Sequence, residues 1–264
     1  MIREDVVSTE HMSERDELRQ GMTVFIFLAV LTGLEFFIAI AIGAVVLLVA
    51  VAVIKVGLVL YYYMHIHRLS QDTSVGAERH SIEYKTGTSR FGLWLFLLSD
   101  SFVFGGLAVA RFNLLGLNRL ALNQVLGLIV TSVLLLSSFF MNRAEASMEH
   151  GDRRGFVLGI SVTLALGVLF VAGVLGIEWP SAIAEGITPD ASGGAAVFFM
   201  MTGMHALHVV TGLIFLAVVL RKGLKGMYSQ EKHWGVEAAA VYWHFVDVVW
   251  IFFYPALYLI GKVL

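Results

Sequence analysis

Seven apolar runs, each long enough to cross a bilayer, constrain this chain more than any other feature of its sequence. They lie near residues 22–41, 44–66, 90–111, 122–142, 155–177, 194–220 and 238–261. A helix needs about 20 apolar residues to cross the hydrocarbon core, and a helix satisfies its own backbone hydrogen bonds there. The sequence therefore predicts an all-α polytopic membrane protein with seven transmembrane helices, arranged as a two-helix hairpin followed by a five-helix bundle.

Composition supports this class and excludes several functions. The chain is 58% hydrophobic and 14% charged, which lies outside the usage of ordinary globular domains. Its formal net charge of −2 gives no reason to expect a nucleic-acid partner. The chain has no cysteine, which excludes disulfides, iron–sulfur clusters and thiolate-bridged copper sites. If the protein takes part in electron transfer, the redox centres lie in other chains.

The basic residues indicate how the chain crosses the membrane. With the N-terminus inside, only Arg111, Arg119 and Lys262 fall outside, and Lys55 lies within a span. The other 14 of the 18 Lys and Arg residues then lie inside, as the positive-inside rule requires. We therefore expect an inside N-terminus and an outside C-terminus. The polar segment 71–89 is the predicted cytoplasmic linker between residues 1–70, which hold the tail and hairpin, and the bundle at 90–264.

The last apolar run carries polar groups that are costly in a bilayer, among them Glu237, His244 and Asp247. At about 100° per residue, one arc of this helix holds Trp243, Asp247, Trp250, Tyr254 and Tyr258. We expect that arc to hydrogen-bond to other helices. The opposite arc is predicted to face lipid, and it holds Phe245, Val246, Val249, Phe252, Phe253 and Ala256.

A second set of polar residues is predicted to meet the last helix in the inner half of the membrane. His205 and His208 lie three residues apart on one face of their helix, and Asp100 and Asp247 fall at a depth similar to that of His208. We expect Asp100, His205, His208 and Asp247 to form one hydrogen-bonded structural cluster without metal, because unpaired groups are costly there. A metal site or a proton relay is the functional alternative.

Two charged residues in the N-terminal hairpin form a candidate intramembrane ion pair. Lys55 lies near the middle of the second run and Glu35 in the first. On a symmetrical hairpin their depths differ by roughly 9 Å, estimated from the helix rise. A carboxylate from another subunit is therefore an alternative partner for Lys55.

Three motifs give the chain a resemblance to a known family. From about residue 90 to 264 it resembles subunit III of the haem–copper cytochrome c oxidases, through LFLLSDSFVFGG, TGMHALHVVTG and EAAAVYWHFVDVVW. The hairpin instead resembles the small subunit IV of bacterial oxidases, through VIKVGLVLYYYMHIH. The resemblance implies a fusion of subunits IV and III.

The resemblance implies an accessory role without a catalytic residue or a bound redox cofactor. Such a subunit docks on catalytic subunit I and on subunit II, which hold haem and copper, binds phospholipid in a cleft, and supports proton uptake and catalytic lifetime. A larger respiratory supercomplex is a further partner that it allows. The family's acidic residue, usually Glu, is Asp100 here. The residues matched to the family's polar core are Asp100, His205, His208, Glu237, His244 and Asp247, and the candidates for lipid contact are Arg221 and Trp243.

The expected setting is a bacterial cytoplasmic membrane and aerobic respiration. Within the family, a subunit of a quinol oxidase or of a nitric-oxide-reductase-associated complex is the alternative. A transporter or proton channel that works alone is the alternative from another class. The spans show no evident inverted repeat, which speaks against a transporter of that kind.

Overall fold

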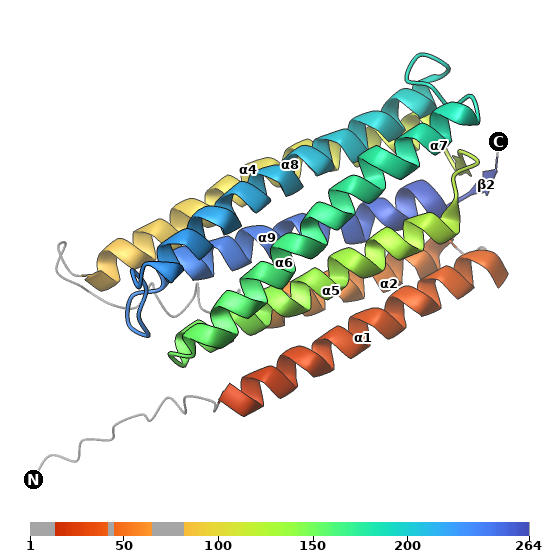
Figure 1. Ribbon diagram of the computed structural model, residues 1–264. Helices are drawn as coiled ribbons and strands as arrows, with labels where there is room; N and C mark the ends of the chain where they lie inside the picture. The colour runs from red at the N-terminus through yellow and green to blue at the C-terminus, as the bar shows by residue number, and fades with distance from the viewer. Residues whose placement is uncertain (1–13, 42–44, 65–81, 264) are drawn as a thin grey trace, which may run out of the picture.

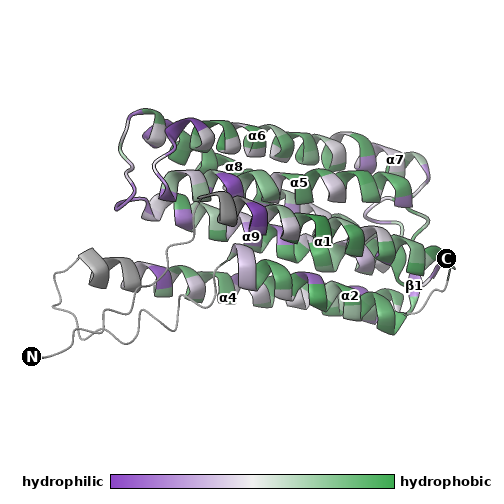
Figure 2. Ribbon diagram, turned by 90° about the horizontal axis from the view of Figure 1, so that it is seen from below, coloured by the Kyte–Doolittle hydropathy of each residue, from purple (hydrophilic) through white to green (hydrophobic). Residues whose placement is uncertain are grey.

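The computed structural model describes residues 14–41, 45–64 and 82–263 and is a bundle of long, nearly parallel helices (Figure 1). Seven helices in this part of the chain are long and apolar enough to cross a membrane, which confirms the predicted class. Figure 2 shows hydrophobic residues along the helices and hydrophilic residues gathered mainly at one end of the bundle. The protein is therefore a multi-pass membrane protein.

The spans follow the predicted order with small shifts at their ends. The hairpin consists of α1 (Glu14–Ala41) and α2 (Val45–Leu58), and α2 continues into the π-helical turn η1 (Val59–Tyr63). The bundle contains α4 (Ile82–Leu115), α5 (Gln124–Glu149), α6 (Arg153–Gly173) with η2 (Val174–Glu178) and α7 (Trp179–Ala184), α8 (Gly193–Leu224), and α9 (Trp234–Tyr254) with η3 (Pro255–Leu259). Residues 71–81 of the predicted linker lie outside the described residues, and residues 82–89 form the start of α4.

Short polar residues begin several of the helices. Asn123 accepts a bond from the backbone N–H of Leu126, and Ser192 accepts one from Ala195, at 3.0 and 3.1 Å. These contacts satisfy N–H groups that have no partner inside a first helical turn. Gly116 follows α4 with φ of 57°, a conformation that glycine adopts without a steric penalty. The chain then turns into β1 (Asn118–Arg119), which pairs in parallel with β2 (Lys262–Val263).

Helix α9 lies at the centre of the bundle, and the prediction that one of its faces lies open to the surrounding bilayer is wrong. In its most apolar 18-residue window, 78% of the residues are buried, against 11% for α4. On the predicted lipid arc, Phe245 and Phe253 are buried, while Phe252 is 40% exposed. Apolar side chains pack equally well against helices and against lipid, so hydropathy does not separate the two environments.

The N-terminal hairpin packs on the bundle through α5 and α9. Helix α1 lies along α5, where the rings of Phe25 and Phe139 are 5.3 Å apart. At the end of η1, the Tyr63 hydroxyl donates to the backbone carbonyl of Gly21 over 2.9 Å. The Tyr63 ring also lies 4.9 Å from the imidazole of His244 on α9. The first two helices therefore contribute to the core around the central helix.

Candidate functional site

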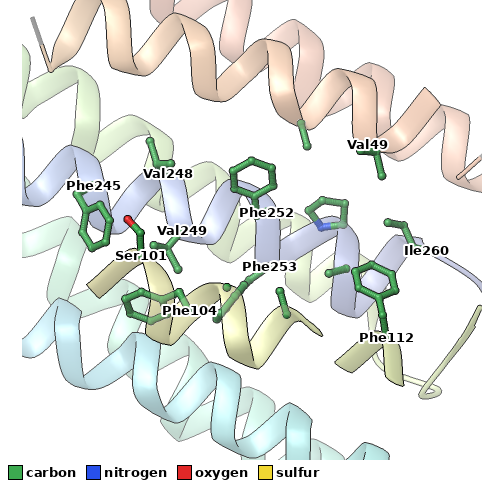
Figure 3. Close-up of a pocket in the computed structure, with 15 residues that line it drawn as sticks. Val49, Ser101, Phe104, Phe112, Phe245, Val248, Val249, Phe252, Phe253 and Ile260 are labelled. Atoms are coloured by element: carbon green, nitrogen blue, oxygen red, sulfur yellow. The ribbon is translucent and has the colours of Figure 1, made fainter. Parts of the chain in front are cut away.

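An apolar pocket separates α4 from α2 and α9. Its volume is about 390 Å³, and it is lined by Val49 and Ala52 from α2, by Ser101, Phe104, Gly105, Ala108 and Phe112 from α4, and by Phe245, Val248, Val249, Phe252, Phe253, Pro255, Ala256 and Ile260 along the last helix (Figure 3). Among these residues Ser101 carries the one side-chain heteroatom, and its hydroxyl donates to the carbonyl of Leu97. We call this feature the interhelical pocket; its chemistry suits a hydrocarbon chain.

Asp100 and His208 meet beside this pocket, where α4 packs against α8. The Nε2 atom of His208 lies 3.5 Å from Asp100 Oδ2, and both side chains are 18% exposed. The Nδ1 atom of His208 lies 2.8 Å from the carbonyl of Met204, so Nδ1 carries a proton. The contact with Asp100 is longer than a direct hydrogen bond, as expected for an aspartate that is one methylene shorter than glutamate. The pocket residue Phe104 covers the imidazole with a ring separation of 4.7 Å.

Asp247 and His244 lie in a different place, on the side of α9 that faces α5. Both contact Ser138: its hydroxyl donates to Asp247 Oδ2 and lies 2.9 Å from His244 Nδ1. The three side chains are buried, with exposures of at most 1%. Although Ser, His and Asp occur together, the serine hydroxyl is directed at the carboxylate rather than at a general base. The arrangement joins two helices and lacks the geometry of a hydrolase triad.

His205 forms a third, separate contact. Its Nε2 atom donates to the backbone carbonyl of Val246 over 3.0 Å, and its ring packs 4.7 Å from the ring of Trp250. The structure therefore contains an Asp100–His208 pair, a Ser138–His244–Asp247 group and a His205 contact. The predicted single cluster of Asp100, His205, His208 and Asp247 is wrong, because Asp100 meets His208 between α4 and α8, whereas Asp247 bonds to α5 and His205 bonds to the backbone of α9.

Two tryptophans add hydrogen bonds between α9 and α5. The Nε1 atom of Trp243 donates to the Ser137 hydroxyl, and that of Trp250 donates to the Thr131 hydroxyl, both over 3.0 Å. Trp243 was a candidate for lipid contact, but it is fully buried. The other candidate, Arg221, lies exposed near the end of α8, at the same end of the bundle as the start of α9.

Two further acidic residues that the sequence singled out, Glu237 and Glu35, each lie beside a basic side chain. Glu237, at the start of α9, accepts a bond of 2.9 Å from Arg90 on α4, and the Arg90 guanidinium lies 5.7 Å from the centre of the Trp234 ring. Glu35 and Lys55 form a fully buried ion pair between α1 and α2. The long lysine side chain covers the offset in depth, so a carboxylate from another subunit is not required.

In the described ranges, no three His, Asp or Glu side chains come together as a metal site. The histidines on α8 and α9 are instead engaged with carbonyl, hydroxyl and carboxylate oxygens. These contacts support helix packing.

Sequence reasoning missed several residues that shape the site. Ser137, Ser138 and Thr131 are hydroxyl residues on an apolar helix, and their spacing of about two turns was the available signal. Arg90 was considered only as a basic residue that indicates membrane orientation. It lies 147 residues before Glu237 in the sequence, so no local pattern predicted their contact. The pocket itself has no sequence signal, because its lining is as apolar as the lipid-facing surface.

Comparison with known proteins gives one consistent result. Residues 11–262 match the profile of the family described as Cytochrome c oxidase subunit III. Cytochrome c oxidase subunit 3 of Sus scrofa is 36% identical over 192 residues, covering 66% of this chain and 70% of the relative. The Cyprinus carpio protein of the same name is 35% identical over the same length and coverage. That of Ceratotherium simum is 34% identical over 202 residues, covering 69% and 73%.

Proposed function

The chain belongs to the cytochrome c oxidase subunit III family, and we propose that this accessory subunit of a haem–copper oxidase holds a phospholipid acyl chain in the interhelical pocket. We also propose that the subunit sustains proton uptake by the complex and that haem and copper lie in partner subunits I and II. The complex would reside in a bacterial cytoplasmic membrane, with the N-terminus of this chain inside. The observation that carries the lipid assignment is the pocket itself.

The pocket has the shape and chemistry that an acyl chain needs. Along the last helix its lining runs from Phe245 to Ile260, which is roughly 22 Å at 1.5 Å per residue. Two of its lining residues, Phe112 and Phe252, are 38% and 40% exposed, so the pocket reaches the outer surface of the bundle. A hydrocarbon chain would contact apolar side chains along this length without leaving a buried polar group unsatisfied.

The contacts of the buried polar groups favour a supporting role in the complex over a catalytic role for this chain. His205 and His244 are fully buried and bonded within the chain, and cysteine is absent from the sequence. The Asp100–His208 pair is partly exposed and lies next to pocket residues Ser101 and Phe104. We propose that this pair links occupancy of the pocket to proton uptake by the neighbouring catalytic subunit.

Two neighbouring glycines on α4 provide a matched test of the lipid assignment. Gly105 lines the pocket, whereas Gly106 does not, and a Cβ atom at either position would meet open space. Gly105→Leu should place its side chain in the pocket and displace the acyl chain, while Gly106→Leu makes the same chemical change outside it. The measurement is the phospholipid that remains with the purified complex after detergent washing, followed by the number of turnovers before inactivation.

We expect Gly105→Leu to lose tightly held phospholipid and working lifetime, with initial turnover unchanged. Gly106→Leu should match the parent protein in all three quantities. Equal phospholipid retention by the two variants would contradict the assignment of the pocket.

A further inference from the structure

Arg111 occupies an unusual environment at the outer end of α4. Its side chain is fully buried, and its guanidinium donates to three backbone carbonyls: Gly116 at 2.7 Å, Asn118 at 2.8 Å and Ile260 at 3.0 Å. In the described part of the chain no carboxylate forms an ion pair with it. A buried guanidinium without a counter-ion is costly, so its surroundings must compensate the charge by other means.

The compensation comes from two helix ends. Gly116 directly follows the last turn of α4, and Ile260 directly follows η3, the last turn of the central helix. The carbonyl ends of helices carry partial negative charge, and these carbonyls lack partners within their own helix. The planar guanidinium presents several donors in fixed directions, which lets one side chain bind both ends at once. Arg111 therefore fastens the outer end of α4 to the outer end of the last helix.

The contacts around Arg111 place this fastening at the outer end of the interhelical pocket. Phe112 and Ile260 line the pocket, and the Arg111 guanidinium lies 4.7 Å from the centre of the Phe112 ring. At the inner end, α4 is joined to the last helix by Arg90, through Glu237 and Trp234. One arginine thus joins the two helices near each membrane surface, and the pocket lies between these two joints.

Helix α4 has little other support on this side. Only 11% of its most apolar window is buried, less than for any other span in the described chain. We propose that Arg111 is a positioning residue that sets the width of the interhelical pocket at its outer end and thereby retains the hydrocarbon chain held there. The retention step rests on the proposed function, whereas the effect on helix spacing does not.

The test measures helix spacing directly in the assembled complex. Because this chain has no native cysteine, spin labels attach within it only at introduced cysteines, and the complex that contains the cysteine-free parent chain gives the background signal of the partner subunits. Asn113→Cys with Lys262→Cys reports the outer end, and Ser89→Cys with Lys232→Cys reports the inner end; all four side chains are exposed. Distances are measured by pulsed electron resonance in the parent protein, Arg111→Met, Arg111→Lys and Arg119→Met. Arg119 is the matched control, an arginine of the same outer segment that makes none of these three contacts.

We expect Arg111→Met to lengthen and broaden the outer distance while leaving the inner distance unchanged, and Arg119→Met to change neither. Arg111→Lys should give an intermediate outer distance, since an ammonium group cannot reproduce the guanidinium fork. An unchanged outer distance in Arg111→Met would overturn the proposal. If that variant fails to assemble, an Arg111→Lys distance identical to the parent's would overturn it instead.

Phospholipid retention separates this proposal from the proposed function. Loss of phospholipid together with a longer outer distance supports both. A longer outer distance with full phospholipid retention would overturn the retention step and leave the spacing role of Arg111 in place, while the comparison of Gly105→Leu with Gly106→Leu decides the assignment of the pocket.

Discussion

Among single residues, the buried side chains of Lys55, His244 and Asp247 have partners that the linear sequence indicates only in part. The Glu35–Lys55 pair was predictable as a candidate, because two opposite charges in adjacent apolar runs have few other options. The partner of His244 was not, since Ser138 lies 106 residues away and serine is common on membrane helices. Residue type thus predicted which side chains are buried, and the packing of α9 against α5 decided their partners.

Asp100→Asn should leave the initial turnover of the complex largely intact. The structure places Asp100 at 3.5 Å from His208 and beside the interhelical pocket. Loss of the carboxylate should weaken the α4–α8 contact by about 1–2 kcal/mol, the size of polar helix contacts in model membrane peptides. We expect lower phospholipid retention and a shorter working life, measured by lipid analysis and sustained oxygen consumption. Loss of turnover from the first cycle, with normal haem content and assembly, would instead indicate a direct proton-relay role.

Lys55→Met should destabilise the protein more than the double change Lys55→Met with Glu35→Gln. The single change leaves a fully buried carboxylate without its counter-charge, which costs about 3–5 kcal/mol by comparison with other buried pairs. The double change removes both charges and should recover most of that loss. The free energy of unfolding of the purified protein in detergent measures both effects. A Lys55→Met variant as stable as the parent would show that the charges of this pair do not contribute to the free energy of unfolding.

At the scale of elements, the last helix shows where sequence reasoning succeeds and where it fails. Its polar arc was correctly predicted to face other helices, because Trp243, Asp247 and Trp250 need partners that lipid does not provide. Its apolar arc was wrongly predicted to face the surrounding bilayer, because Phe245 and Phe253 are equally compatible with a protein interior. The position of a helix within a membrane bundle therefore depends on shape, which small residues on neighbouring helices reveal better than hydropathy.

Gly167→Ala on α6 should destabilise the bundle because of this close packing. A Cβ atom there would lie 2.6 Å from the buried ring of Trp243, whereas one at Gly106 meets open space. Overpacking of this kind costs about 1–3 kcal/mol. The measurement is the thermal unfolding midpoint in detergent, with Gly106→Ala as the matched control. Equal midpoints for the two variants would contradict the central, tightly packed position of α9.

At the scale of the whole molecule, the chain is a hairpin and a bundle that share one core. The family profile begins at residue 11 and includes the hairpin, and α1 and α2 pack on α5 and α9. The fusion of a subunit IV-like hairpin with a subunit III-like bundle stays a prediction. The number and order of the spans were predictable, since length and hydropathy determine both. The position of the hairpin on the bundle was not predictable, because it depends on contacts between distant residues such as Tyr63 and Gly21.

Cutting the chain between residues 65 and 81 tests the fusion. If the hairpin is an appended unit, co-expression of the two parts should still give an assembled complex, because each part closes its own backbone hydrogen bonds. Assembly is measured by co-purification of both parts with the catalytic subunit. Failure to assemble, with both parts inserted in the membrane, would favour a single seven-helix unit.

Orientation is tested by labelling from outside the cell. The asymmetry of Lys and Arg predicts that the segment around Gly76 faces the cytoplasm and that Lys262 faces the outside. With no native cysteine, Gly76→Cys should escape an impermeant thiol reagent in intact cells, and Lys262→Cys should react. Labelling of Gly76→Cys but not of Lys262→Cys would show that the chain has the opposite orientation in the membrane.

We propose that this chain is an accessory subunit without a redox centre of its own, and purification through a tag on this chain is the decisive experiment. In mild detergent we expect subunits that carry haem and copper to co-purify with it. After the subunits are dissociated, haem spectra and metal analysis should find both groups in the partner chains and neither in this one. Haem or copper retained by this chain, or a stably folded chain that purifies from its native membrane without any haem-bearing partner, would contradict the account.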